Sequence, residues 1–315
     1  MILIISSLGL DPQVKLITAR LKKIGQRYVV LNTHSLNRGK VISISAHKPG
    51  LIHMDGKEVG VVSKIYYATL PRVDAILDVP GDVVYPSEWR QRIDFFVDEL
   101  LYFLEKSASS FPCTNYEMRL LDYKIILTQK LNNYGVSTLF DNIELSSKLL
   151  SVDKEIFVKP VGFPFVLTNK KDSFDEVCVT RYGSALDGNF TKLPSYSMKL
   201  IEQSVHVRAF VSQDKFFAVS RQVEQADQSL DYRLTNDDGL NKKIKWNKFI
   251  LPDSELQGIQ KMMVDDNINW LIPEFLIDRK GACYLIDLNP AGDWYGYFDK
   301  STRGQIANII CSHLF

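Results

Sequence analysis

The sequence predicts an α/β (α+β) protein whose N-terminal part contains a parallel sheet. Two observations support this fold class. The chain begins with strand-like and helix-like segments in alternation, which indicates a parallel sheet, and it ends in a hairpin of strand-like segments. Its 315 residues suggest two or three subdomains rather than a single core.

Bulk composition excludes several classes of protein. The hydrophobic content of 45% and the charged content of 24% are typical of globular chains. A formal net charge of +1 gives no general electrostatic reason to bind nucleic acid or an anionic membrane. No stretch approaches ~20 consecutive apolar residues, so no transmembrane helix is expected. The apolar N-terminus lacks a preceding basic region, which favours a first strand over a signal peptide.

The cysteines and histidines are scattered along the chain. The four cysteines form no C-x-x-C pair, which indicates reduced thiols and predicts a cytoplasmic protein. The five histidines form no zinc-binding pattern.

Residues 1–110 are predicted to form the N-terminal domain. Residues 1–7 form a first strand, Asp11-Pro12 begins a helix, and Gly25 ends it, because proline favours the first helical turn and glycine the position after the last one. A second helix follows Ser87 and spans about 88–106, where apolar residues recur at helical spacing. Further strands are expected at Tyr28–Leu31, Val41–Ser45, Leu51–Met54 and Lys64–Tyr67.

Residues 111–200 carry two lysines in distinct contexts. Lys124 lies in a helical stretch that begins at Asn115, and Lys159 ends the apolar, strand-like run 155–159. A lysine carries a point charge on a long stem, which suits contact with a phosphate. Each lysine alone is more typical of a solvated surface charge, and only their two contexts together, in this order, favour phosphate binding.

Residues 201–315 are predicted to begin with two strands, Val205–Val211 and Phe216–Gln222. The polar segment Glu224–Asn247 is typical of a surface loop, and loops of this length are often active-site lids. A final helix at Gln305–Leu314 is apolar along one face.

The segment Trp270–Trp294 is the most informative for function. Two apolar runs flank the turn-like Arg279-Lys280-Gly281, which predicts a hairpin. Side chains alternate along a strand, so Asp287 and Asn289 share one face, and Glu274 on the preceding strand can lie opposite them.

These oxygen-bearing side chains suit a magnesium ion. Burying an unpaired carboxylate is costly, and Mg²⁺ bound to nucleotide phosphates would remove the penalty. A hairpin whose acids simply face solvent is the alternative that spacing leaves open.

The order of these residues resembles the metal-binding end of the ATP-grasp ligases, in which an Asp, a Glu and an Asn hold the Mg²⁺ ions of Mg·ATP. Glu274 stands at the position of the family's Asp, Asp287 at that of its Glu, and Asn289 matches. The following Pro290-Ala291-Gly292-Asp293-Trp294 resembles the Asn-Pro-Asn-Gly-Gln-Trp signature of graspetide (microviridin-type) peptide ligases, from which Ala291 and Asp293 depart.

This resemblance covers about residues 111–295 and implies an ATP-grasp fold. Residues 1–110 would be the pre-ATP-grasp domain, 111–200 the central subdomain, and 201–315 the C-terminal subdomain with its Mg-binding hairpin. Lys124 and Lys159 would bind the nucleotide phosphates. Glu202 and Val205 would contact the base and ribose at the hinge where adenine docks.

Three arginines are implied to surround the reacting groups. Arg208 matches the family, and Arg221 ends the next strand. Arg233 lies in a segment, 231–236, that resembles the Asp-aromatic-Arg-x-x-Asn pattern of graspetide ligases and of ribosomal-protein glutamyl ligases. A guanidinium binds phosphate oxygens bidentately. The chain departs from the family at two places: His206 replaces an Asp, and Gly162 is the only glycine in place of a glycine-rich phosphate loop.

The implied activity is ADP-forming ligation of a carboxylate to an amine or hydroxyl through an acyl-phosphate, with ATP and Mg²⁺ as cofactors. Three hypotheses stay open: a macrocyclase that makes side-chain ester or amide crosslinks in a ribosomal precursor peptide, a glutamyl-ligase-type enzyme that adds amino acids to a protein or small molecule, and a nucleotide- or peptide-binding pseudo-enzyme. The expected partner is a precursor peptide or other carboxylate-bearing substrate, not nucleic acid or membrane, and a homodimer is left open.

Overall fold

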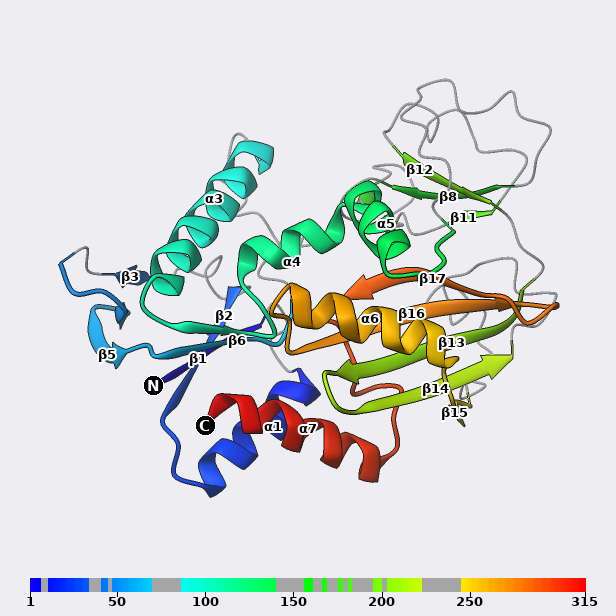
Figure 1. Cartoon of the computed structure of the whole chain (residues 1–315). Helices are drawn as coiled ribbons and strands as arrows, with labels where there is room; N and C mark the ends of the chain where they lie inside the picture. The colour runs from blue at the N-terminus through cyan, green and yellow to red at the C-terminus, as the bar shows by residue number, and fades with distance from the viewer. Residues whose placement is uncertain are drawn as a thin grey trace.

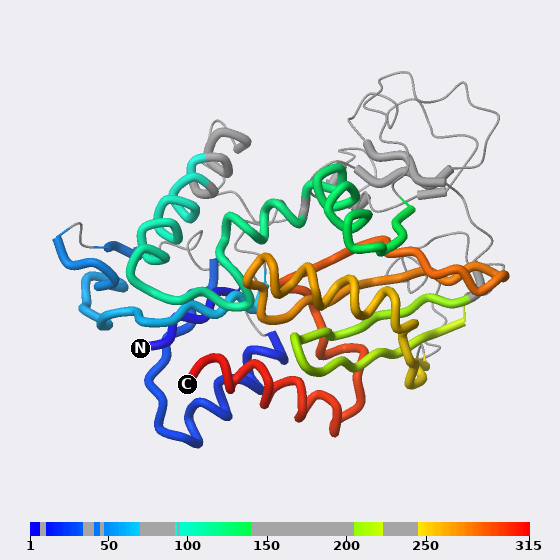
Figure 2. Tube along the Cα trace, viewed as in Figure 1, coloured from blue at the N-terminus to red at the C-terminus, as the bar shows by residue number. Residues whose placement is uncertain are grey.

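The computed structural model describes twelve stretches of the chain: residues 1–6, 11–33, 41–44, 47–69, 86–139, 156–160, 166–168, 175–177, 181–182, 195–199, 203–222 and 245–315. Figure 1 shows these elements, and Figure 2 traces the same view along the chain. The predicted division at residues 110 and 200 stays a prediction.

The N-terminal part contains a four-stranded parallel sheet in the order β2-β1-β6-β7, as the strand–helix alternation predicted. Helix α1 connects its first two strands. It begins after Asp11, whose carboxylate accepts a hydrogen bond from the Gln13 amide at 2.9 Å, and it is followed by Gly25 at φ +71°. The bounds are β1 Ile2–Ser6, α1 Pro12–Lys23, β2 Tyr28–Asn32, β6 Lys64–Tyr67 and β7 Ser109–Phe111.

A small antiparallel sheet and a long helix lie beside this parallel sheet (Figure 1). The sheet contains β3 Ile42–Ile44, β4 Leu51–Met54 and β5 Lys57–Val61. Helix α3 spans Pro86–Glu105, so Ser87 lies inside the helix and not before it as predicted. Proline is well tolerated in the first helical turn, which explains the earlier start.

The single helix predicted after Asn115 is two helices, α4 Asn115–Asp122 and α5 Lys124–Asn133. Tyr123 is extended, with φ −76° and ψ 94°, and interrupts the helical ladder. Neither glycine nor proline marks this break, so it could not be predicted from residue types. The break places Lys124 at the first position of α5.

The largest sheet is antiparallel, with the strand order β15-β14-β13-β16-β17. The predicted hairpin is confirmed: β16 and β17 pair directly, and the Asp278 carboxylate accepts hydrogen bonds from the Lys280 and Ala282 amides in their turn, each at 2.8 Å. The strands are β13 Gln203–Ser212, β14 Phe216–Gln222, β15 Asn247–Phe249, β16 Trp270–Asp278 and β17 Cys283–Asn289, and the associated helices are α6 Asp253–Asp265 and α7 Lys300–Leu314.

Two groups of shorter strands complete the described elements. Strand β8 pairs antiparallel with β11 and β12, and β9 pairs antiparallel with β10. Their bounds are β8 Ile156–Pro160, β9 Val166–Thr168, β10 Asp175–Val177, β11 Arg181–Tyr182 and β12 Ser195–Lys199.

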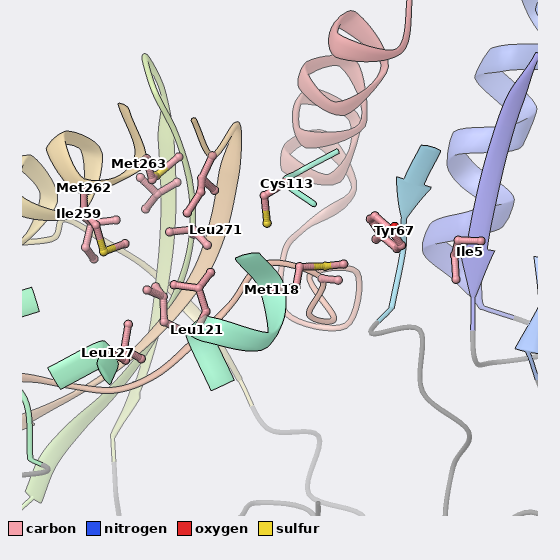
Figure 3. Packing of buried hydrophobic residues seen from close by; sticks show 14 of the residues in the cluster. Ile5, Tyr67, Cys113, Met118, Leu121, Leu127, Ile259, Met262, Met263 and Leu271 are labelled. Atoms are coloured by element: carbon pink, nitrogen blue, oxygen red, sulfur yellow. The ribbon is translucent and has the colours of Figure 1, made fainter. Parts of the chain in front are cut away.

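The apolar core runs without interruption from the parallel sheet to the antiparallel one. Met118 and Leu121 of α4 lie between Tyr67 of the parallel sheet and Leu271 of β16, as Figure 3 shows. Helix α6 covers the same face of the large sheet through Ile259, Met262 and Met263, all fully buried. This packing covers one face of the large sheet. The polar residues lie at one end of its other face.

A second apolar cluster packs α1 and α7 against the opposite face of the large sheet. Trp270 and Trp294 are its largest members, each 1% exposed. Helices α1 and α7 lie side by side, and the Arg20 guanidinium donates to the Gly304 carbonyl at 3.0 Å. Cys113, Cys283 and Cys311 are buried free thiols.

Within the described ranges, every helix is too short or too polar to cross a bilayer.

Two helical glycines make a matched test of packing. A Cβ on Gly258 of α6 would lie 2.6 Å from the Tyr134 carbonyl oxygen, whereas one on Gly304 of α7 would meet nothing closer than 3.5 Å. Gly258→Ala is therefore expected to lower the free energy of unfolding by about 2 kcal/mol through overpacking. Gly304→Ala is expected to raise it by about 0.5–1 kcal/mol through helix propensity. Urea unfolding measures both, and equal effects of the two changes would contradict this packing.

Candidate active site

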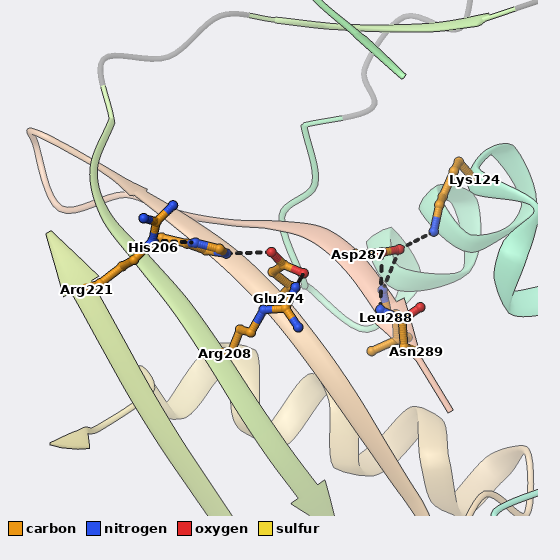
Figure 4. Close-up of polar contacts among 8 residues, drawn as sticks. All are labelled: Lys124, His206, Arg208, Arg221, Glu274, Asp287, Leu288 and Asn289. Carbon is orange, nitrogen blue, oxygen red and sulfur yellow. Dashed lines mark hydrogen bonds and ion pairs between the residues drawn. The ribbon is translucent and has the colours of Figure 1, made fainter. Parts of the chain in front are cut away.

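Strand register brings the candidate residues to one face of the large sheet. Arg208 on β13 lies directly opposite Glu274 on β16, and Glu274 lies directly opposite Asp287 on β17. Asn289 lies opposite Ile272, two residues before Glu274. The three strands therefore present a guanidinium, two carboxylates and an amide side by side (Figure 4).

Glu274 is the centre of this arrangement. Its side chain is 12% exposed, and each carboxylate oxygen has a cationic or hydrogen-bonding partner. Oε1 lies 2.5 Å from Nε2 of His206, and Oε2 lies 2.8 Å from a guanidinium nitrogen of Arg208. Burial alone would raise the pKa of Glu274, but the Arg208 charge and the contact with His206 lower it to about 2. The group is therefore an anion across the physiological range.

Asp287 is compensated from a different part of the fold. The Lys124 ammonium, at the start of α5, forms an ion pair and hydrogen bond with Oδ1 of Asp287. Lys124 is only 6% exposed, so the pair is largely shielded from water. The Asn289 amide donates to Oδ2 of Asp287 at 3.1 Å. Asp287 thus connects the hairpin, the neighbouring amide and the N-terminal end of α5.

Aromatic rings hold the two arginines. The Arg208 guanidinium lies over the Tyr297 ring at 4.2 Å, and that of Arg221 lies 5.9 Å from the Trp246 ring. The Trp246 and Tyr297 rings meet edge to face with centroids 5.2 Å apart. Cation–π contacts of this kind are worth about 0.5–2 kcal/mol and restrict the guanidinium plane. Both arginines are therefore held in place on the same face as the carboxylates.

The donor set fits magnesium bound with phosphate. Among the described residues, no group of three or more His, Cys, Asp and Glu could enclose a metal. Glu274, Asp287 and Asn289 offer two carboxylates and an amide oxygen, which is the partial oxygen shell that Mg²⁺ takes when phosphates supply further ligands. A carboxylate has about four lone-pair sites, so the two contacts of Glu274 do not exhaust it.

The structure brings six predicted site residues together: Lys124, Arg208, Arg221, Glu274, Asp287 and Asn289. Val205 lies on β13, and its side chain packs toward the apolar core. Lys159 lies in β8, but its side chain is outside the described residues, as are Glu202, Arg233 and Gly162. The roles assigned to all ten site residues stay predictions.

Sequence reasoning missed three features of the site. Trp246 and Tyr297 were not expected beside the arginines, and His206 was identified only as a departure from the family's Asp. Strand register pairs His206 with Arg221 and brings it beside Glu274. A prediction of that register would have located His206 in the site. The contact between Lys124 and Asp287 has no local signal, because 163 residues separate the two.

Neither a protein-family model nor a curated protein sequence matches this chain. Solved structures do match it. The macrocyclase MdnC of Microcystis aeruginosa MRC, bound with its precursor peptide MdnA, superposes with a TM-score of 0.75 at 14% identity, and the match covers 99% of each chain. A RiPP-associated ATP-grasp ligase of Chryseobacterium gregarium, in complex with ADP and a leader and core peptide, gives 0.71 at 16% identity over 99% of this chain and 96% of the other.

A third structure, the ATP-grasp ligase PsnB complexed with a minimal precursor, Mg and ADP, gives a TM-score of 0.65 at 13% identity over 99% of this chain and 97% of the other. The matches extend over nearly the full length of both chains. The chain therefore has the ATP-grasp fold that the order of its motifs predicted.

The pKa of Glu274 generates a prediction about stability and pH. Its value of about 2 in the folded protein lies below the ordinary 4.5, so the ionised group stabilises the fold above pH 4.5, and this stabilisation is lost as the pH falls toward 2. Glu274→Gln is expected to cost about 3 kcal/mol at pH 7, because it leaves the charge of Arg208 uncompensated.

The deficit of Glu274→Gln should shrink steadily as the pH falls from 4.5 toward 2, because the unfolded parent takes up a proton in this range while the folded parent stays ionised. Urea unfolding at a series of pH values measures the difference, with Glu99→Gln on the exposed side of α3 as the control. A deficit that is the same at pH 3 as at pH 7 would refute the charge assignment.

Proposed function

We propose that this protein is an ATP-dependent, ADP-forming peptide ligase that joins side-chain carboxylates of a ribosomally made precursor peptide to hydroxyl or amine side chains of the same peptide. The observation that carries the proposal is the single polar face of the large sheet, where Lys124, Arg208, Arg221, Glu274 and Asp287 meet in an ATP-grasp fold. With three cations and two carboxylates, this face carries a net positive charge that suits phosphates.

Each proposed role follows from the chemistry of the side chain. Asp287, Asn289 and Glu274 would hold Mg²⁺, which neutralises phosphate charge when bound. Lys124, which pairs with Asp287, would exchange this contact for a nucleotide phosphate, since an ammonium pairs with either anion. Lys159 is proposed to bind a second phosphate, and Glu202 and Val205 to contact the adenosine.

The reaction has two displacements. An oxygen of the substrate carboxylate attacks the γ-phosphorus of ATP, and ADP leaves to give an acyl-phosphate. A hydroxyl or amine then attacks the acyl carbon, loses its proton, and phosphate leaves. Arg208 and Arg221, with Arg233 proposed beside them, would stabilise charge spread over several oxygens, for which a planar guanidinium is better suited than an ammonium.

Two features favour a peptide macrocyclase over a ligase that adds free amino acids. The loop after β17 keeps the Asn-Pro-x-Gly-x-Trp spacing, and its Trp294 is buried in the cluster between the large sheet and the N-terminal part. In addition, MdnC and the Chryseobacterium ligase, which superpose over nearly the whole chain, were solved with precursor or leader peptides.

The direct test is product analysis. The protein is incubated with Mg·ATP and a short peptide rich in Asp or Glu and in Thr, Ser or Lys that is encoded beside its gene. We expect ADP and phosphate in equal amounts, and a peptide mass lower by one water for each bond formed. AMP and pyrophosphate would rule out an acyl-phosphate route. ADP with a peptide that gains an added amino acid would favour the glutamyl-ligase type, and nucleotide binding without turnover would favour a pseudo-enzyme.

Replacement of Asp287 tests the metal assignment separately. Mg·ADP is expected to raise the melting temperature of the parent, because a ligand that binds only the folded state stabilises it by mass action. In Asp287→Asn this shift should shrink to a small fraction of its parental size, since a charged metal ligand is gone.

The control for this measurement is Asp253→Asn, which removes one carboxylate from the exposed first turn of α6 and should keep the full shift. Equal shifts in parent and Asp287→Asn would show that Asp287 does not hold the metal.

A further inference from the structure

His206 lies between a cation and an anion inside the site. It is 1% exposed on β13. Its Nε2 is 2.5 Å from Oε1 of Glu274, and its Nδ1 is 3.3 Å from Nε of Arg221 (Figure 4). The imidazole therefore bridges the guanidinium of β14 and the carboxylate of β16.

These two contacts select one form of the imidazole. The Nε–H of Arg221 is a donor and cannot accept, so Nδ1 of His206 must accept and carries no proton. A neutral imidazole then has its proton on Nε2, where it points at Oε1 of Glu274.

Neighbouring rings and charges keep the imidazole and its partner in one orientation. The edge of Trp246 meets the His206 ring at 64°, with centroids 5.5 Å apart. On Glu274, His206 occupies Oε1 while Arg208 occupies Oε2, so the carboxylate plane is fixed from both sides. Arg208 is in turn held between Glu274 and the ring of Tyr297.

We propose that His206 is a positioning residue: with Nδ1 accepting from Arg221 and Nε2 directed at Glu274, it fixes Glu274 and, through Glu274, the Arg208 guanidinium. The tautomer and the Glu274 contact stand on the geometry alone. The effect on turnover rests on the proposed function, because Arg208 acts there on the acyl-phosphate.

The tautomer is tested without turnover. The full-length protein is labelled with ¹⁵N-histidine, and two-bond ¹H–¹⁵N correlations are recorded at neutral pH. The His206 signals are assigned by their loss in His206→Gln. We expect Nδ1 to be the unprotonated acceptor and Nε2 to carry the proton in the parent, and a mixture of tautomers in Arg221→Leu. A proton on Nδ1 in the parent would overturn the proposal.

The effect on turnover is tested with two isosteric variants. The amide of His206→Gln can place an N–H near the position of Nε2, whereas that of His206→Asn reaches only the position of Nδ1. At saturating Mg²⁺, His206→Asn is expected to lose about 10–100-fold in kcat for ADP formation, with KM for ATP nearly unchanged. His206→Gln should recover most of that loss. A rise in KM at parental kcat, or equal losses in both variants, would overturn the positioning role.

His53→Asn on β4, in a different sheet, is the control and should change neither kinetic parameter. Melting temperatures confirm that each variant is folded. If a His206 variant does not fold, Arg221→Leu still tests the tautomer of His206. If the parent forms no ADP with any peptide, the proposed function fails, while the NMR result still decides the form of His206.

Discussion

The buried negative charge of Glu274 is the constraint on which the rest of the site depends. Removing a carboxylate from water is costly, and this one is kept ionised only because Arg208 and His206 contact its two oxygens. Both partners come from β13. The charge of Glu274 is therefore compensated only when β13 and β16 pair in this register. A slip of one residue would turn Glu274 toward the apolar face beneath α6, with no partner there.

That apolar face is what makes the polar one rigid. Helices α4 and α6 pack against it and join the large sheet to the N-terminal sheet in one core. The same packing places Lys124 next to Asp287, because the break at Tyr123 starts α5 beside β17. The chain after α5 then runs along the edge of β17, where the Leu285 amide donates to the Ser137 carbonyl at 2.8 Å. The edge strand that carries Asp287 and Asn289 is therefore supported on both sides.

The charges of the site suit a reaction in which the protein mainly positions groups and neutralises charge. In the proposed ligase reaction, phosphoryl transfer needs little covalent participation from the enzyme, so no nucleophilic side chain is required. Fixed guanidinium groups over aromatic rings meet that need because they do not reorganise as charge develops. The imidazole of His206 bridges Arg221 and Glu274 and so adds orientation to this site.

By itself, the sequence determined the local elements and the order of the motifs. Strand alternation and the turn at Gly281 predicted the hairpin, and spacing showed that Glu274 could lie opposite Asp287 and Asn289, because both depend on neighbours within about 25 residues. The same reasoning missed α6, β5, β7 and β15, whose apolar patterns are short or mixed with polar residues.

Only the tertiary structure decided which charges compensate one another. His206 meets Glu274 across 68 residues and Lys124 meets Asp287 across 163, and no period in the sequence encodes contacts at such separations. They arise because the antiparallel register and the break at Tyr123 bring the groups together. The sequence thus specified the chemical groups of the site, and packing of the two sheets around one core fixed their partners.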